Sequence, residues 1–231
     1  QPMNLEPGFY ALVGPNAAGK THYLHSMMGP GAALVPAGPD ANFAGTTVAD
    51  HLRAVRTARP LQELDIADAR LKNLSVGQRR LLTLEVALAT AAPLLLLDEP
   101  LDGIDVATRK QARQRLIDYI AEDPERTVAM ASHRPEDFAG LATHVIQVFD
   151  REVSRPVALD DARLCFPTVT GPAAEIAELA ARFPVAETAS LGPTTRATFA
   201  EPISDGECHL PVSYPTDAEL IDLLATERIA R

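Results

Sequence analysis

Hydrophobic residues in the first 150 positions occur both as short continuous runs and as longer stretches with helical spacing. The short runs predict strands at 9–13, 33–35, 94–97, 127–131 and 145–149. Helical spacing predicts helices over 21–28, 47–59, 75–90 and 104–122, with another beginning at 135–141. The run at 94–97 consists of four leucines, which is typical of a strand buried on both faces of a parallel sheet. Strands that alternate with helices in this way predict an α/β layered domain.

The pattern changes after about residue 155. Residues 166–231 contain PTVTG, a helical stretch at 173–182, a polar stretch with two strands, and a helical stretch at 216–225. This β–α–β–β–α order predicts a small ferredoxin-like α+β appendage. We therefore expect two domains, 1–155 and 156–231, the first with a short helical subdomain at about 46–92.

Composition narrows the class of protein. The chain has 231 residues, 46% of them hydrophobic and 23% charged, which is the balance of a globular protein with a core. Its formal net charge of −10 argues against nucleic acid as a partner, because phosphate binding needs clustered Lys and Arg. No apolar run is long enough for a membrane span. Cys165 and Cys208 are expected to be free thiols in a reducing compartment.

The segment GPNAAGKT, residues 14–21, fits the pattern G-x-x-x-x-G-K-[ST] between a predicted strand and a predicted helix. Gly14 and Gly19 let the backbone curl so that successive N–H groups form a nest for phosphate oxygens. Lys20 is placed to reach the β- and γ-phosphates, and the Thr21 hydroxyl is placed to ligate Mg²⁺. The other positions expected to contact phosphate are Asn16, Ala17, Ala18 and His22.

Two acids follow the four leucines in LLLLDEP, where the predicted strand emerges at its C-terminal edge. Asp98 is expected to hold Mg²⁺ directly or through water, and Glu99 to orient or deprotonate an attacking water. His133 ends the strand TVAMAS at the same kind of sheet edge and is a candidate γ-phosphate contact.

The stretch LSVGQRRL, residues 74–81, allows two interpretations. Ser75 and Gly77 precede or begin a predicted helix, so the segment is either a helix cap or an anion site formed by backbone N–H groups without an intrahelical partner. The stretch itself does not decide between them.

Taken together, GPNAAGKT, LSVGQ, LLLLDEP and His133 resemble the nucleotide-binding subunit of ABC transporters over about residues 5–155. The resemblance implies a RecA-like P-loop NTPase fold, an ATP and Mg²⁺ site, and a head-to-tail dimer with two ATP molecules between its subunits. It implies that Ser75, Val76, Gly77 and Gln78 contact the γ-phosphate bound to the partner subunit, and that Asp105 lies in the loop that crosses the dimer interface. Glu99 and His133 would be catalytic, with Thr21 and Asp98 on the metal.

The sequence departs from that family in three places. Val76 stands at the first glycine of the signature, and Ala37 replaces the glutamine that ligates Mg²⁺ and reports the nucleotide state to the membrane partner, so hydrolysis is expected to be slow. The strands and the adenine-stacking aromatic that the family has upstream of the phosphate loop are not in this sequence. We expect Phe9 and Tyr10 to be core residues rather than a base platform.

Three functions remain open at this level. The first is the ATP-hydrolysing subunit of a transporter, located in the cytoplasm at the inner face of the cell membrane and bound to a separate transmembrane permease, as a homodimer or as a heterodimer with a similar ATPase. The second is a soluble ATP-dependent switch or assembly factor, and the third is a degenerate nucleotide-binding module with little hydrolysis. DNA-repair relatives are disfavoured by the net charge. The tail loosely resembles a regulatory extension of some exporter-type subunits, and it is otherwise a dimerisation or packing appendage.

Overall fold

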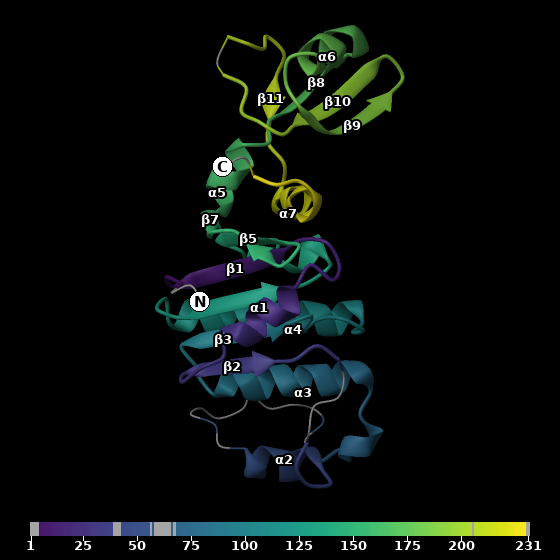
Figure 1. Ribbon diagram of the computed structural model, residues 1–231. Helices are drawn as coiled ribbons and strands as arrows, with labels where there is room; N and C mark the ends of the chain where they lie inside the picture. The colour runs from purple at the N-terminus through teal and green to yellow at the C-terminus, as the bar shows by residue number, and fades with distance from the viewer. Residues whose placement is uncertain are drawn as a thin grey trace. The chain divides into compact units, whose positions relative to one another are not determined.

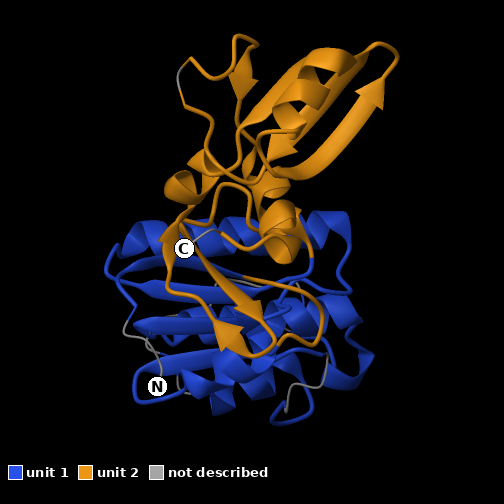
Figure 2. Ribbon diagram, turned by 45° about the horizontal axis from the view of Figure 1, so that its top comes forward, with its two compact units in different colours: residues 1–12, 19–133 blue, residues 13–18, 134–231 orange. Residues whose placement is uncertain are grey.

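The computed structural model describes residues 5–38, 43–55, 57, 66, 68–204 and 206–229. The chain forms two compact units, one of residues 1–12 and 19–133 and the other of residues 13–18 and 134–231 (Figure 2). The second unit includes residues 13–18 and 134–155, which lie within the predicted first domain. The domain boundary after residue 155 stays a prediction. No helix in the described ranges is long and apolar enough to cross a membrane.

The first unit is built on parallel strands in the order β2 (Ala32–Val35), β3 (Leu94–Asp98), β4 (Thr127–Ala131) and β1 (Gly8–Val13) (Figure 1). The register places Asp98 beside Ala131 and Leu12 beside the same residue on the other side of β4. Phe9 and Tyr10 are buried, as expected of core residues. The C-terminal ends of β3 and β4 therefore lie next to each other, which is where ligands bind in sheets of this kind.

The helices of this unit are α1 (Lys20–Ser26), α2 (Val48–Ala54), α3 (Val76–Ala89) and α4 (Val106–Glu122), with the short 3-10 helix η1 (Leu71–Asn73). The start of α3 and that of α4 follow from local chemistry, because Ser75 and Asp105 cap them with side-chain oxygens. A buried ion pair of 2.8 Å between Glu85 and Arg115 joins α3 to α4.

A small cluster forms the helical part of the first unit. Val48, Leu71, Leu74 and Leu82 make its buried centre. A capping box of Thr47 and Asp50 starts α2. The helix predicted over 47–59 is shorter in the structure, because α2 ends at Ala54 and Val55 is extended. The rest of that prediction falls largely outside the described residues.

In the second unit, β5 (His144–Phe149) pairs antiparallel with β6 (Glu152–Val153) and β7 (Val157–Ala158), and α5 (Leu159–Leu164) follows. The helix predicted to begin over 135–141 is wrong beyond its first turn, since only the 3-10 helix η2 (Pro135–Asp137) forms. Gly140 takes a φ of 70°, and its N–H bonds to a carboxylate oxygen of Asp217 at 2.9 Å rather than continuing a helix.

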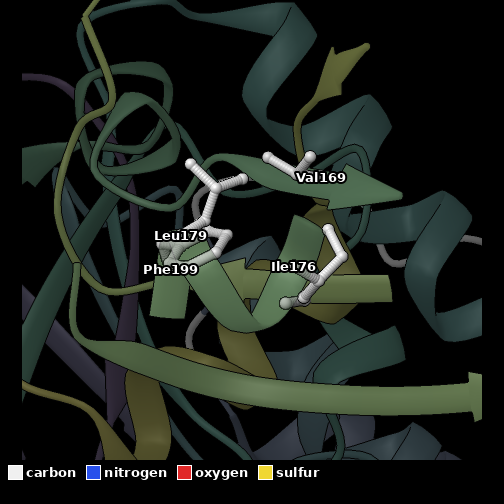
Figure 3. Packing of buried hydrophobic residues seen from close by; sticks show 5 residues of the cluster. Val169, Ile176, Leu179 and Phe199 are labelled. Carbon is white, nitrogen blue, oxygen red and sulfur yellow. The ribbon is translucent and has the colours of Figure 1, made fainter. Parts of the chain in front are cut away.

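A second, four-stranded antiparallel sheet follows in the order β11 (Val212–Ser213), β8 (Thr168–Pro172), β10 (Thr194–Phe199) and β9 (Val185–Leu191). Helix α6 (Ala173–Ala180) packs on it through Ile176 and Leu179, which meet Val169 and Phe199 of the sheet (Figure 3). The β8–α6–β9–β10 order is the split βαβ arrangement that the sequence predicts, with β11 as an additional strand.

The last helix, α7 (Asp217–Thr226), packs against η2 and the β5 strand. Three hydrogen bonds from the buried Gln147 of β5 hold the end of this segment: Nε2 donates to the carbonyl oxygens of Leu224 (2.9 Å) and Glu227 (2.6 Å), and Oε1 accepts from Ile229 N–H (3.0 Å). The carboxylate of Asp217 also pairs with Arg163 of α5. The helix expected to end the appendage therefore returns to the β5 part of the second unit.

Candidate functional site

The first part of the predicted phosphate loop lies in the second unit, and its shape depends on Gly14. This residue has a φ of 142°, and a Cβ built on it would lie 2.0 Å from the carbonyl oxygen of Val148. Ala18 N–H bonds to the carbonyl oxygen of Pro15 (3.2 Å), while the carbonyl oxygen of Ala18 accepts from Arg151 N–H (2.9 Å). Only glycine can let the loop pass this close to β5.

Ala17 is in the left-handed region, at a φ of 61°, which an alanine adopts at a cost. Asn16 and Ala17 are exposed, while Ala18 is buried. A turn that places consecutive N–H groups around one concave point is the arrangement that binds phosphate oxygens.

The second part of the loop belongs to the first unit. Gly19, at a φ of 109°, is the N-cap of α1 and offers no side chain to cap the helix. Lys20 is half-buried, and burial lowers the pKa of its ammonium group, while the nearby carboxylates of Glu99 and Asp98 act in the opposite direction. Thr21 and His22 are exposed on the first turn of α1. The lysine charge is thus held close to Asp98 at the end of β3 and to Glu99 directly after it.

Asp98 is the last residue of β3 and is 1% exposed. Its Oδ2 atom has no hydrogen-bond partner within the described part of the chain. A buried carboxylate oxygen without a donor is costly unless a cation or water supplies the missing interaction. No group of three or more His, Cys, Asp or Glu side chains with metal-site geometry occurs among the described residues. One carboxylate with a hydroxyl and phosphate oxygens suits Mg²⁺, which rarely needs an all-protein cage.

Glu99 has a φ of 48°, which is uncommon for a residue with a side chain. Two hydrogen bonds fix its backbone: its N–H donates to Ala131 of β4 (2.9 Å), and its carbonyl oxygen accepts from the Nη1 atom of the buried Arg80 (3.0 Å). Sequence reasoning missed Arg80, because nothing in RRLL indicates that one of two adjacent arginines turns inward. The result is a glutamate held in a strained conformation at the sheet edge.

The carboxylate of Glu99 meets His133, as the candidate roles of both residues require. Oε2 lies 2.8 Å from the Nδ1 atom of His133 and accepts the backbone N–H of the same residue at 3.3 Å. On the other side of the ring, Nε2 lies 3.9 Å from Oδ1 of Asp102. His133 is partly open to solvent, so this carboxylate–imidazole pair is accessible to a ligand at the ends of β3 and β4.

The start of α3 settles part of the question that LSVGQ poses. Ser75 Oγ accepts from Gln78 N–H (3.2 Å), and Gln78 Oε1 accepts from Ser75 N–H (2.9 Å), which is a capping box. The segment is thus a capped helix start. The box does not use the N–H groups of Val76 and Gly77, so an anion can still bind to them.

The loop after Pro100 packs on this helix start. Gly103, at a φ of 69°, lies close to Val76, and Gly77 faces Ile104 and Asp105. Asp105 caps α4 by accepting from the N–H groups of Ala107 and Thr108, both at 3.0 Å. The hydrogen bond from the Thr108 hydroxyl, followed by these backbone bonds, lowers the pKa of the Asp105 carboxyl group. Asp105 is therefore engaged within its own chain.

Ala37, at the position of the expected glutamine, is exposed two residues after β2. A methyl group there supplies no oxygen for a metal. In the first unit the structure thus brings together Lys20, Asp98, Glu99 and His133, while it leaves Thr21 and His22 on the surface of α1.

Comparisons with known proteins find similarity to the family that the sequence motifs resemble. Residues 31–102 match the family model described as ABC transporter. Relatives include the ABC transporter ATP-binding protein YtrB of Bacillus subtilis (33% identical, covering 39% of this chain and 30% of the relative). Another is the cytochrome c biogenesis ATP-binding export protein CcmA of Novosphingobium aromaticivorans (36% identical, covering 42% and 51%). The chain spans about half or less of the length of these relatives.

Solved structures share the fold. An ATP-binding subunit of an ABC transporter superposes with a TM-score of 0.58 at 19% identity, covering 68% of this chain and 81% of the other. The dimeric ATP-binding cassette MJ0796, in a post-hydrolysis state with ADP and phosphate, gives 0.55 at 19% identity, covering 68% and 88%. These likenesses confirm the predicted P-loop fold, and residues 31–102 are similar to the ABC transporter family.

Proposed function

We propose that this chain is an ATP-binding and ATP-hydrolysing subunit that drives an ABC transporter through nucleotide-dependent dimerisation. The main support is the contact of 2.8 Å between Oε2 of Glu99 and Nδ1 of His133. Asp98, the residue before Glu99, is buried and has no hydrogen-bond partner for Oδ2 among the described residues. A phosphoryl-transfer site needs a general base in a fixed position, here Glu99 bonded to an imidazole, and a carboxylate free to bind a metal ion, here Asp98.

Lys20 and the N–H groups of the loop 14–21 would bind the triphosphate. The ammonium group of Lys20 is half-buried beside two acids, so a triphosphate would find a cation that is poorly hydrated. The nest of the loop supplies hydrogen bonds without a charge of its own. Lys20 would hold the γ-phosphate close to Glu99.

Thr21 and Asp98 fit Mg²⁺, because one offers a hydroxyl and the other a buried oxygen without a donor. When bound, Mg²⁺ neutralises charge that develops on the β- and γ-phosphate oxygens. Ala37 contributes no ligand, so water completes the coordination that a glutamine would share.

Glu99 would take the proton of the attacking water as that water adds to the γ-phosphorus and the β–γ bridging oxygen leaves. His133 holds the carboxylate through Nδ1 and its own backbone N–H, which fixes the acceptor oxygen before substrate arrives. The backbone contacts of Glu99 to Ala131 and Arg80 maintain this position. General base catalysis of this kind is worth ~10²–10⁴-fold in rate.

The helix start at Val76 and Gly77 would contact the γ-phosphate of a second subunit. Its two N–H groups lie outside the capping box, and the positive end of α3 attracts an anion. ATP would then be part of a dimer interface, so that binding closes the dimer and hydrolysis opens it. A homodimer and a heterodimer with a similar subunit both fit this arrangement.

The Glu99→Gln variant tests the chemistry. We expect it to lose ATP turnover by two orders of magnitude or more and to accumulate as an ATP-bound dimer in size-exclusion chromatography. Glu125→Gln is the matched control, because Glu125 is exposed and lies outside the site. Equal turnover in the wild type and Glu99→Gln would refute the role of Glu99.

The Lys20→Ala variant tests the phosphate loop. Removing the cation is expected to weaken binding of a fluorescent ATP analogue by at least tenfold, because a charge-assisted hydrogen bond is worth ~1.5–3 kcal/mol. Lys110→Ala, an exposed lysine on α4, is the control. Unchanged affinity in Lys20→Ala would contradict the assignment of the loop.

Ala37 favours a second candidate function, a nucleotide-binding module with little hydrolysis. The Ala37→Gln variant, compared with the wild type, separates the two. Low wild-type turnover that rises strongly in the variant would favour the module, while substantial wild-type turnover that changes little in the variant would favour the hydrolysing subunit.

The proposal includes a membrane partner. It rests on similarity to proteins named for import, such as the molybdenum import ATP-binding protein ModC of Aromatoleum aromaticum, and for export, such as CcmA. We infer that the chain binds a transmembrane permease at the cytoplasmic face of the membrane. Co-purification of the chain with a detergent-extracted permease, enriched by Glu99→Gln and ATP, would support this, and recovery of the chain only in the soluble fraction would oppose it.

A further inference from the structure

The strand β9 forms one edge of the second sheet (Figure 1). It runs for seven residues and pairs only with β10 among the described strands. The opposite edge is β11, which is two residues long and ends in a proline-containing segment. Proteins usually prevent pairing between sheet edges by short edge strands, charges or prolines. β9 is seven residues long and contains one charge and no proline.

The hairpin geometry shows which backbone groups of β9 face outward. Leu191 and Thr194 flank a two-residue turn that begins with Gly192 at a φ of 60°, so they are a hydrogen-bonded pair. Hydrogen-bonded pairs alternate along an antiparallel ladder, which makes Ala189 and Glu187 bond to β10 as well. The N–H and C=O groups of Thr188 and Ser190 therefore point away from the sheet.

A bulge at the start of β9 confines this regular edge to residues 187–191, because the register shifts between Thr198 and Phe199 of the partner strand. Within those residues, Glu187 is the sole charge. Leu191 is 87% exposed, which is unusual for a leucine at the end of a strand. Apart from Glu187, no charge on this edge opposes pairing with another strand.

The edge is complementary to itself. Pairing two copies antiparallel about Ala189 would set Thr188 against Ser190 of the other copy, twice, so that four backbone hydrogen bonds form. The hydroxyls of Thr188 and Ser190 would also be opposite one another, which is a favourable cross-strand pair. Glu187 would face Leu191 of the other copy, and the two glutamates would lie about 14 Å apart along the strand. No like charges meet, and the small Ala189 permits the close approach at the centre.

We propose that β9 joins the second sheets of two copies of this chain into one continuous antiparallel sheet of eight strands. The contact has two-fold symmetry, as closed homodimers do. It uses backbone groups of β9 and none of the residues proposed to bind nucleotide, so it forms without ATP and is distinct from the ATP-dependent dimer of the proposed function. Its small area makes it a weak association that depends on concentration.

Disulfide trapping tests the register. In a Cys165→Ala/Cys208→Ala background, the Ala189→Cys variant places two thiols at a non-hydrogen-bonded pair, where the Cα atoms are about 4.5–5.5 Å apart and a disulfide fits. We expect a covalent dimer on mild oxidation without nucleotide. Thr170→Cys is the control, because Thr170 is also exposed but lies on β8, inside the sheet. Equal dimer yield from both variants, or none from Ala189→Cys, would overturn the proposal.

Sedimentation without nucleotide tests the hydrogen bonds. Thr188→Pro removes an outward N–H from each copy, and with it two of the four hydrogen bonds, while leaving the ladder to β10 intact. The dissociation constant of the dimer is expected to rise at least tenfold. Thr188→Val keeps the N–H and should change it little. A chain that stays monomeric at several hundred micromolar, or a folded Thr188→Pro variant that dimerises like the wild type, would refute the proposal, whereas the Glu99→Gln dimer with ATP should form in either case.

Discussion

The close passage of Gly14 under β5 makes the phosphate loop sensitive to a single methyl group. In Gly14→Ala the new Cβ would lie 2.0 Å from the carbonyl oxygen of Val148, and contacts below 3.0 Å are essentially never observed, so one of the two backbones must retreat by about 1 Å. The φ of 142° adds strain of ~1–3 kcal/mol for any residue with a side chain. Overpacking costs a further ~1–3 kcal/mol. We expect a loss of about 4 kcal/mol in the free energy of unfolding.

Substitutions at two other glycines separate the causes of this loss of stability. Gly192 has a φ of 60° but no atom within 4 Å of a built Cβ, so Gly192→Ala should cost only the left-handed strain of ~1–2 kcal/mol. Gly29 has neither an unfavourable φ nor a neighbour within 4 Å, and Gly29→Ala should be neutral. The order of the three variants separates steric clash from backbone strain.

Urea unfolding followed by far-ultraviolet circular dichroism measures stability, since the chain has no tryptophan. A loss of about 4 kcal/mol corresponds to a fall in the midpoint of about 1–2 M, for a slope of ~2–3 kcal/mol/M. If the loop relaxes instead, the affinity for an ATP analogue falls while the midpoint changes less. A Gly14→Ala variant with both the midpoint and the affinity of Gly29→Ala would refute the reasoning.

Three further variants test other parts of the molecule. Arg115→Met leaves the buried Glu85 without its partner, so we expect the free energy of unfolding, measured in urea, to fall by about 3 kcal/mol. Adding Glu85→Met to the same chain should recover most of this loss. Burial already raises the pKa of Glu85, against the opposing effect of Arg115. Burial lowers the pKa of His51, whose Nδ1 accepts from Ala44 N–H. The unfolded chain therefore binds a proton at His51 at a higher pH than the folded chain, and the free energy of unfolding falls as pH drops below about 6.5. His51→Asn should weaken this dependence of stability on pH. Gln147→Ala removes three hydrogen bonds to the C-terminal segment and should raise hydrogen exchange at the end of α7, with β8 as the unaffected reference.

Local chemistry in the sequence determined most of the secondary structure and the candidate chemistry. The four leucines before Asp98 predict a buried strand because no polar side chain interrupts them. Ser75 suits a helix start because its oxygen satisfies an N–H group three residues on. The resemblance of GPNAAGKT, LSVGQ and LLLLDEP to one family likewise depends on short, contiguous segments. These features need no knowledge of distant neighbours.

Tertiary structure decided what depends on residues far apart in the chain. Gly14 must be glycine because of Val148, Arg80 turns inward to hold Glu99, and α7 returns to β5 because Gln147 binds its final carbonyls. The helix expected at 135–141 stops after one turn because the N–H of Gly140 bonds to Asp217 instead. Each of these contacts joins positions at least 19 residues apart, and pattern analysis detects only neighbours within a few turns of helix or strand. The sequence therefore specified most of the elements and the candidate side chains, whereas packing fixed which of them meet.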